Sequence, residues 1–367
     1  MTRMRAALLE ASGSDLRVDH VTIEDPRPGH VLVRIAGCGV CHSDLSLVDG
    51  TFPCPVPVVL GHEAAGVVEA VGTAVDEVAV GDHVVLTACP PCGACYWCVR
   101  GEASLCVASQ AIQTNTFPDG TTGLARGDAL VYRGLGVAGF AEYAVVPARA
   151  AVKIPTDVSL EIASVIGCAV QTGVGAVLNT ARVEAGATVL VMGLGGIGLS
   201  VVQGARVAGA ARIIAADPVA HRREAAARFG ATDVIDPGAE DVLASVQSLT
   251  GVGVDYAFDA AGRARLVELG ITATRPGGTT VSVGAASLEE TITISTPALF
   301  TVSERKLIGC VLGSCNALRD IPRLVALWQA GQLDLAGLVT RQRPLAEINL
   351  AMDDLRAGRG IRTVLVG

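Results

Sequence analysis

The sequence predicts an α/β protein with two domains, one rich in β-structure and the other built on a doubly wound parallel sheet. Three observations lead to this prediction. The chain has 367 residues, half of them hydrophobic, and a domain commonly contains about 150 residues, so two full cores can form. Short β-branched runs extend to about residue 165, and apolar strands alternate with helical stretches from about residue 169.

The first part of the chain predicts an irregular β-barrel or sandwich. Short alternating or β-branched runs lie at 31–35, 67–71 and 83–86. Turn-forming residues such as Gly72 and Gly81 separate them. Closely spaced short strands with frequent turn signals are typical of barrels and sandwiches.

The part after residue 169 predicts stacked strand–helix–strand units around a parallel sheet. The predicted strands are 188–192, 212–216, 233–235, 254–259 and 279–284. Helices are predicted to follow the first two strands, to about residue 208 and over 219–229. The last stretch predicts helices at 321–330 and 344–357 and a strand at 361–366.

Composition excludes several classes of partner. The net charge of −8 leaves no basic stripe for nucleic acid and no polybasic patch for a membrane surface. The uncharged segment 185–205 is long enough to span a bilayer, but its glycines favour a buried strand, a tight turn and a core helix. Without a secretory apolar stretch we expect a cytoplasmic protein, in which the eleven cysteines are buried thiols or metal ligands.

A glycine-rich turn indicates a dinucleotide site. The run Gly193-Leu194-Gly195-Gly196-Ile197-Gly198 fits G-x-G-x-x-G and lies directly between a predicted strand and a predicted helix. Asp217 follows the next strand, where an acid can bind the ribose diol and repel a 2′-phosphate, so NAD is favoured. Arg222 and Arg223 lie nearby and keep NADP open as an alternative. The alternative is a glycine-rich turn in an ordinary parallel sheet that binds no dinucleotide.

A cysteine cluster predicts a structural zinc site. Cys92, Cys95, Cys98 and Cys106 have the spacing C-x2-C-x2-C-x7-C, which lets four thiolates converge on one ion. A redox pair would not need four cysteines, and buried free thiols are the ordinary alternative. Cys89 lies three residues before Cys92, so spacing alone does not choose the four ligands.

A second group predicts an open, catalytic metal site. Cys41 and His62, with the distant Cys168, supply two thiolates and one imidazole, a three-ligand zinc set with one free position. Asp44 can orient His62 through its other ring nitrogen. Taken alone, Cys41 and His62 are more often a core thiol and a hydrogen-bonded core histidine, and only their combination with nearby Ser43 and other polar groups favours a site.

Together these residues resemble the zinc-dependent alcohol dehydrogenases of the medium-chain dehydrogenase/reductase superfamily. The resemblance covers essentially the whole chain and rests on residues 61–63, the cysteine cluster, the 193–198 turn and residues 360–364. It implies a GroES-like catalytic domain from residues 1–170 and 311–367, with a Rossmann NAD-binding domain at 171–310. It also implies a homodimer or homotetramer.

The resemblance further implies the site residues. Catalytic zinc is expected on Cys41, His62 and Cys168, with Glu63 behind it and Ser43 in the proton relay. Structural zinc is expected on Cys92, Cys95, Cys98 and Cys106, which leaves Cys89 near the substrate pocket. The expected cofactor-binding residues are His42, Thr172, Gly193, Gly195, Gly196, Ile197, Gly198, Asp217, Arg222, Val283 and Arg362.

The chain departs from the family pattern at three positions. Ser46 stands where liver-type members carry a relay histidine, so the relay must end in another group or in water. Ala88 replaces an aromatic residue that often narrows the substrate pocket, which predicts a roomier pocket. Gln110 aligns with the arginine that binds the glutathione adduct in formaldehyde dehydrogenases, which disfavours that substrate.

We therefore expect reversible oxidation of an alcohol to an aldehyde or ketone, with hydride passing from a zinc-bound alkoxide to NAD. One alternative within the class is a carbonyl reductase or polyol dehydrogenase acting on bulky or secondary substrates. Cys168 disfavours the polyol dehydrogenase, because such members often have an acid at this ligand position. The other alternative is a zinc-stabilised NAD-binding sensor or scaffold without turnover, which would not need an open metal position.

Overall fold

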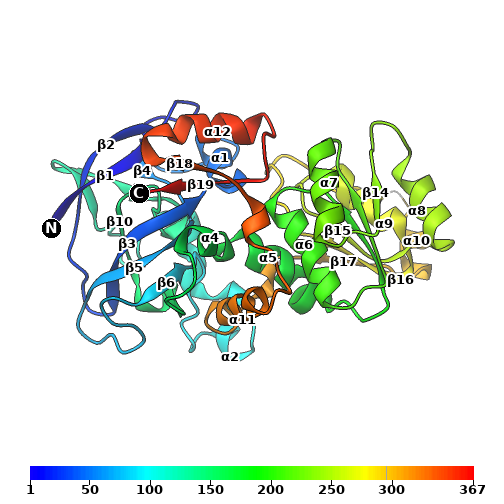
Figure 1. Ribbon diagram of the computed structural model, residues 1–367, viewed down its shortest axis with the longest axis horizontal. Helices are drawn as coiled ribbons and strands as arrows, with labels where there is room; N and C mark the ends of the chain where they lie inside the picture. The colour runs from blue at the N-terminus through cyan, green and yellow to red at the C-terminus, as the bar shows by residue number, and fades with distance from the viewer. Residues whose placement is uncertain (295) are drawn as a thin grey trace. The chain divides into compact units, whose positions relative to one another are not determined.

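The computed structural model describes all residues except Ser295 and the side chain of Gln110. It divides into two compact units, which we describe separately. Unit 1 contains Met1–Cys168, Cys315–Ala330 and Leu335–Gly367, so that both ends of the chain belong to it (Figure 1). Unit 2 contains Ala169–Ser314 and Gly331–Asp334.

Unit 1 is built on two sheets. In its described part, the six-stranded sheet has the order β8-β7-β2-β1-β4-β9. These strands are β1 (Thr2–Leu9), β2 (Arg17–Ile23), β4 (Val58–Val59), β7 (Leu124–Arg126), β8 (Ala129–Leu130) and β9 (Tyr132–Arg133). The seven-stranded sheet has the order β11-β6-β5-β3-β19-β18, and β10 also pairs with β3. Its strands are β3 (His30–Gly39), β5 (Glu63–Val71), β6 (His83–Leu86), β10 (Tyr143–Pro147), β11 (Ala151–Ile154), β18 (Val339–Pro344) and β19 (Arg362–Val366).

Helices and short 3₁₀ turns connect these strands. The α-helices of unit 1 are α1 (His42–Val48), α2 (Tyr96–Val99), α3 (Ala111–Thr114), α4 (Leu160–Ala163), α11 (Ala317–Gln329) and α12 (Ile348–Arg356). Short 3₁₀ turns include η2 (Val107–Gln110) and η5 (Ser164–Gly167). The largest core of the unit lies against the seven-stranded sheet, where Val33, Val68 and Leu365 are buried.

Unit 2 is a parallel sheet with the order β14-β13-β12-β15-β16-β17 among its described residues. The strands are β12 (Thr188–Met192), β13 (Arg212–Ala216), β14 (Asp233–Ile235), β15 (Val254–Asp259), β16 (Thr274–Ser282) and β17 (Lys306–Gly309). The helices are α5 (Ala169–Gly175), the π-helix η6 (Ala176–Ala181), α6 (Gly196–Val207), α7 (Ala220–Phe229), α8 (Val242–Thr250), α9 (Ala264–Ala273) and α10 (Pro297–Val302). Leu190, Ile214 and Ala257 are fully buried in its core, as expected for a parallel sheet.

The predicted fold class is confirmed, and so is the strand, turn and helix expected for residues 185–205, which form β12 and α6. Among the described residues no single helix is long and apolar enough to cross a membrane. The bent pair Leu160–Gly167 and Ala169–Ala181 meets the length and composition criteria only when both helices are taken together.

Three predicted boundaries were wrong. The strand predicted at 279–284 begins at Thr274, because its register with β15 shifts and the intervening Pro-Gly-Gly reads as a turn. The helix predicted at 344–357 is shorter: β18 extends to Pro344, a 3₁₀ turn follows, and α12 begins at Ile348. The helix predicted at 321–330 begins one turn earlier, where the Asp320 carboxylate accepts the Asn316 N–H.

Candidate active site and metal centres

Two neighbouring strands bring Cys41 and His62 together. β3 and β5 pair antiparallel with Gly39 opposite Glu63, so Cys41, just beyond β3, lies beside His62, just before β5. Glycine at position 39 leaves room for the Glu63 carboxylate, with which a Cβ atom would collide. Cys41 has an extended backbone and caps the N-terminus of α1.

Cys168 joins this group from a distant part of the chain. It follows η5, which packs against β5 and β6. A Cβ atom on Gly167 would lie 2.5 Å from the Leu86 carbonyl oxygen and 3.7 Å from the Glu63 Cα. Glycine at 167 therefore allows the chain to approach both strands closely, and the next residue is Cys168.

The resulting cluster is a candidate metal centre. One ligand atom each from Cys41, His62, Glu63 and Cys168 lies within 4.8 Å of the others, and all four residues are buried. Two sulfurs and an imidazole nitrogen are the donors of a catalytic zinc site. The structure thus brings together the three predicted ligands, and it adds a carboxylate oxygen of Glu63 within the same distance.

Asp44 fixes the orientation of His62. Its Oδ1 accepts hydrogen bonds from His62 Nδ1 at 3.1 Å and from the Gly61 N–H at 2.9 Å, and its Oδ2 accepts the Cys41 N–H at 3.3 Å. Burial lowers the pKa of His62, but the Asp44 charge outweighs it and raises that pKa well above its usual value. Because Nδ1 is bound to Asp44, Nε2 is the nitrogen left for a metal ion.

The sulfurs of Cys41 and Cys168 interact directly. A hydrogen bond from Cys168 lowers the pKa of Cys41 well below its usual value, and the same contact raises the pKa of Cys168. Two cysteine sulfurs side by side are a soft donor pair, and both become negatively charged thiolates when a metal ion displaces their protons. Such a pair fits a divalent zinc ion.

A buried ion pair lies behind the cluster. Arg362 on β19 contacts Glu63 at 3.3 Å, and its Nη1 donates to the Val40 carbonyl oxygen at 2.8 Å. Burial lowers the pKa of Arg362, but attraction to Glu63, Cys41 and Cys168 raises it above its usual value. Burial has the opposite effect on the acid, because it disfavours the charged carboxylate, and raises the pKa of Glu63 to about 7. The structure therefore places the Arg362 side chain on Glu63, and its binding of pyrophosphate stays a prediction.

The first turn of α1 carries the predicted relay. Ser43 is half-buried, and its Oγ lies 3.9 Å from the Cys41 sulfur. His42 is exposed at the start of the helix, and Ser46 is half-buried one turn later. Of the expected relay residues, Ser43 is the one that contacts the cluster.

The second metal-ligand cluster contains the predicted four cysteines. The sulfurs of Cys92, Cys95, Cys98 and Cys106 lie within 4.8 Å of one another. The Cys92–Cys98 and Cys95–Cys106 sulfur pairs are 4.0 and 3.9 Å apart. Four ligands at a zinc–sulfur distance of about 2.3 Å are separated by about 3.8 Å in a regular tetrahedron. The spacing of these sulfurs therefore fits zinc.

Backbone N–H groups donate hydrogen bonds to sulfurs of this cluster. The Cys95 N–H donates to the Cys92 sulfur at 3.3 Å and the Ala108 N–H to Cys106 at 3.4 Å. Hydrogen bonds from backbone N–H groups lower the pKa of Cys95 to about 6. Cys89 lies outside this cluster and is buried, and burial raises its pKa to about 11.

In unit 2 the glycine-rich turn has the geometry of a dinucleotide site. Gly193 has φ +88°, and a Cβ atom on Gly198 would collide with the Gly193 carbonyl oxygen. By contrast, nothing lies within 4 Å of a Cβ atom built on Gly195, so a phosphate can approach the backbone there. These three glycines thus serve the turn, the helix–strand packing and the open face of the loop.

Asp217 is tied to this loop. Its Oδ2 accepts the Leu194 N–H at 2.7 Å and its Oδ1 accepts the Val219 N–H at 2.8 Å. Arg222 Nη1 lies 3.9 Å from the carboxylate. Of the residues expected near the nicotinamide, Thr172 and Val283 are buried and Ile197 is half-buried, and Thr172 Oγ1 is buried without a hydrogen-bond partner.

Some features of the sites were not predicted from the sequence. The sequence did not predict that the backbone at Gly39 and Gly167 lies close to neighbouring residues. A usable signal was present, because Gly39 stands two residues before the ligand Cys41 and Gly167 stands directly before the ligand Cys168. Ala88 lines a cavity in unit 1 that also contains Arg133, which sequence reasoning did not single out. The side chain of Gln110 lies outside the described residues.

Comparison with known proteins agrees with this geometry. A family model described as an alcohol dehydrogenase GroES-like domain matches residues 27–156, and one described as a zinc-binding dehydrogenase matches residues 196–330. S-(hydroxymethyl)glutathione dehydrogenase from Synechocystis and an NDMA-dependent alcohol dehydrogenase from Amycolatopsis methanolica are each 38% identical to this chain, over 99% of both sequences.

Solved structures similar to this chain are also alcohol dehydrogenases. An alcohol dehydrogenase zinc-binding domain protein from Burkholderia ambifaria is 36% identical with a TM-score of 0.95, covering 100% of this chain and 99% of its own. Benzyl alcohol dehydrogenase from Acinetobacter calcoaceticus is 33% identical with a TM-score of 0.94 and the same coverage. The chain therefore belongs to the zinc-dependent alcohol dehydrogenases of the medium-chain dehydrogenase/reductase superfamily, enzymes that interconvert alcohols with aldehydes or ketones using zinc and NAD.

Proposed function

We propose that this enzyme oxidises alcohols at the site formed by Cys41, His62 and Cys168, and that it also works in reverse. The observation that carries the proposal is the convergence of these three donors within 4.8 Å, with Asp44 holding Nδ1 of His62. A protein that only bound zinc for stability would be served by the four-cysteine cluster alone. The second donor set, with three non-carboxylate ligands, favours a metal that takes part in the reaction.

The side chains around the site have distinct roles in this proposal. Bound zinc supplies a Lewis acid that lowers the pKa of an alcohol hydroxyl, and bound NAD supplies the hydride acceptor. Ser43 Oγ accepts a hydrogen bond from the alcohol hydroxyl and takes up its proton as the Ser43 O–H proton is released, a role supported by its distance of 3.9 Å from the Cys41 sulfur. Ser46 has no imidazole to take the proton further, so the proton passes to water. Glu63 and Arg362 balance charge behind the thiolates.

The cofactor contacts and the domain limits are part of the same proposal. Residues 1–170 and 311–367 form the catalytic domain, and residues 171–310 bind NAD. Asp217 accepts hydrogen bonds from the adenosine ribose, which its two free lone pairs still allow while it accepts from Leu194 and Val219. The proposed contacts are His42, Thr172, Gly193, Gly195, Gly196, Ile197, Gly198, Asp217, Arg222, Val283 and Arg362.

Removing single ligands tests the proposal. Cys41→Ala and His62→Ala should each lower the zinc content by one ion per chain and reduce NADH formation by at least about 10³-fold. Fluorescence titration with NADH should still give a dissociation constant within about twofold of the wild type. Cys54→Ala is the matched control, because Cys54 is half-buried and outside both clusters. Full activity in either ligand variant would contradict the mechanism.

The substrate class is proposed from the pocket. Ala88 is buried at the position where the family resemblance implies an aromatic side chain, and its small size favours bulky substrates such as aryl alcohols and secondary alcohols. The structural similarity to a benzyl alcohol dehydrogenase supports the same class. Steady-state rates with primary, secondary and aryl alcohols, with S-(hydroxymethyl)glutathione and with the matching ketones decide between alcohol oxidation and the alternative of carbonyl reduction. Ala88→Phe should reduce kcat/KM for aryl alcohols more than for ethanol.

We propose a homodimer or homotetramer in the cytoplasm. β17 is the last strand in the described sheet of unit 2, so its outer edge is free to pair with a second copy. Exposed apolar side chains precede it in the chain, namely Leu288, Ile292, Ile294, Leu299 and Val302. All eleven cysteines are free thiols, which fits a reducing compartment. Light scattering after size-exclusion chromatography measures the number of chains.

A further inference from the structure

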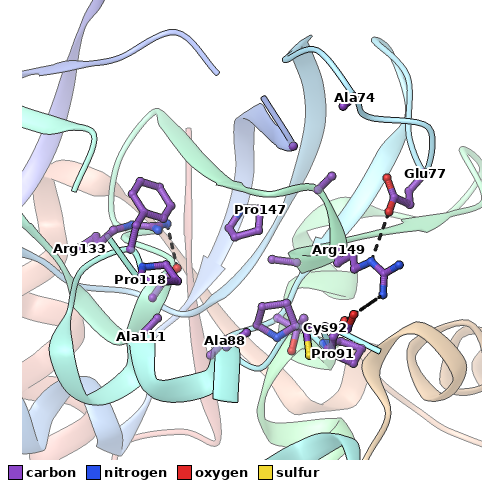
Figure 2. Close-up of a pocket in the computed structure, with 18 residues that line it drawn as sticks. Ala74, Glu77, Ala88, Pro91, Cys92, Ala111, Pro118, Arg133, Pro147 and Arg149 are labelled. Carbon is purple, nitrogen blue, oxygen red and sulfur yellow. Dashed lines mark hydrogen bonds and ion pairs between the residues drawn. The ribbon is translucent and has the colours of Figure 1, made fainter. Parts of the chain in front are cut away.

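The cavity in unit 1 that Ala88 and Arg133 line contains none of the proposed ligands of the catalytic metal. Its volume is about 290 Å³, and most of its wall consists of small apolar residues such as Ala74, Ala88 and Ala111 (Figure 2). Three charged side chains also line it: Glu77, Arg133 and Arg149. The function described above uses none of these three.

Arg133 is the unusual member of this wall. It is only 2% exposed, and its guanidinium carbon lies 3.7 Å from the centre of the Phe117 ring. Its Nη2 donates to the carbonyl oxygens of Gly136 at 2.9 Å and Val145 at 2.7 Å. A guanidinium group has five N–H donors. In the described part of the chain, the N–H groups on Nε and Nη1 have no acceptor.

The charge of Arg133 is not balanced by the protein. Arg149, on the same wall, is paired with Glu77 at 3.5 Å. Figure 2 shows this pair and Arg133 as separate groups of the cavity wall. No carboxylate among the described residues lies within ion-pair distance of Arg133. Burial lowers the pKa of Arg133 to about 9, which leaves the group charged at neutral pH.

A second arginine beside Phe117, Arg27, has its charge neutralised. Arg27 lies 4.3 Å from the centre of that ring and pairs with Glu24 at 3.1 Å and Asp119 at 2.6 Å. Arg133 is therefore the one cation of this region that lacks a counter-ion in the described structure. A buried charge without a partner is strongly unfavourable, and a buried cation bordering a cavity favours an anion inside it.

We infer that this cavity binds a small organic carboxylate, with the carboxylate on the free N–H groups of Arg133 and an apolar body against the alanines. A single guanidinium matches a single negative charge. The apolar wall would leave a multiply charged anion such as phosphate poorly solvated. Ordered water could instead satisfy the N–H groups, since the cavity is large enough, and the experiment distinguishes that case from a bound acid.

The experiment titrates the zinc-loaded enzyme with benzoate by calorimetry, with benzamide as the neutral analogue of the same shape. We expect one benzoate site per chain and at least about tenfold weaker binding of benzamide, because charge-assisted hydrogen bonds are the stronger ones. Arg133→Met and the cavity-filling Ala111→Leu should each weaken benzoate binding by at least about tenfold. Arg149→Gln is the matched control and should stay within about threefold, because Arg149 is already paired with Glu77.

Several results would overturn the inference. They are the absence of saturable benzoate binding, equal binding of benzamide, and equal benzoate affinity in the wild type and both variants, which would place benzoate elsewhere, for example on the catalytic metal. Weakening in Arg133→Met but not in Ala111→Leu would place the anion outside the cavity and also overturn it. If Arg133→Met does not fold, Arg133→Lys replaces it, because lysine keeps the charge but cannot reproduce the donor geometry.

Discussion

Asp44 Oδ1 and His62 Nδ1 are joined by a buried hydrogen bond of 3.1 Å, so the imidazole has only Nε2 left for the metal. Asp44→Asn keeps an oxygen acceptor but removes the charge that stabilises the imidazole as a donor. We expect the affinity for the catalytic zinc to fall by about 10- to 100-fold. Competition with a chromogenic chelator measures this affinity. Asp49→Asn at the exposed C-terminal end of the same helix is the control and should not change it.

The four-cysteine cluster gives a prediction about metal content and stability. Cys98→Ala should remove one zinc ion per chain and lower the Tm by at least about 5 °C, because structural zinc contributes directly to folding. Cys89→Ala should keep both ions, because Cys89 lies outside the cluster. Elemental analysis and thermal unfolding of both variants provide the measurements. Loss of an ion from Cys89→Ala would mean that the ligand set is wrong.

Cys89 also predicts a pH dependence of stability. Its usual pKa is 9.0, and burial raises the folded-state pKa to about 11. Between these values the unfolded chain releases the thiol proton and the folded chain keeps it, so stability falls as the pH rises. The loss is about 1.4 kcal/mol per pH unit, or up to about 3 kcal/mol by pH 11. Cys89→Ala lacks this contribution.

The measurement for Cys89 is denaturant unfolding of both proteins at pH 8, 9, 10 and 11. The difference in the free energy of unfolding between wild type and Cys89→Ala should shrink steadily above about pH 9. A difference that stays constant from pH 8 to pH 11 would show that the thiol does not titrate as its burial requires.

Asp217 determines the choice of cofactor in our proposal. Asp217→Ala removes the carboxylate that repels a 2′-phosphate, and it leaves Arg222 without the acid that lies 3.9 Å away. We expect kcat/KM to fall for NAD and to rise for NADP, with the ratio of the two changing by at least about 100-fold. Initial rates with both cofactors measure the ratio. An unchanged ratio would exclude Asp217 as the discriminating group.

The sequence was sufficient for the parts of the fold with a continuous pattern. Strands such as Thr188–Met192 and Arg212–Ala216 are buried on both faces, so their apolar runs stand out with sharp ends. The strand Val339–Pro344 was missed, because its side chains are mostly exposed and its existence depends on pairing with β19. Strand pairing of this kind involves distant residues and leaves no local signal.

For the metal-binding residues and Arg133 too, local sequence pattern was informative, and contacts between distant residues could not be predicted. Spacing identified five candidate thiols but could not exclude Cys89, since C-x2-C occurs on both sides of Cys92. The three-dimensional grouping depends on the loop that brings Cys106 back to Cys92. The unpaired charge of Arg133 could not be predicted either. Whether an arginine has a partner is decided by residues from several distant segments, and the sequence does not show which of them meet.

The strand that completes the seven-stranded sheet has a consequence for biosynthesis. β19 pairs with β3 and carries Arg362, which contacts Glu63. In the chain, β19 comes after the first 168 residues of unit 1 and after the whole of unit 2. A ribosome therefore delivers unit 2 in nearly complete form while the sheet behind the metal ligands still lacks its last partner. Unit 2 can fold during translation, whereas the sheet of the metal-binding unit is completed only after β19 has been made.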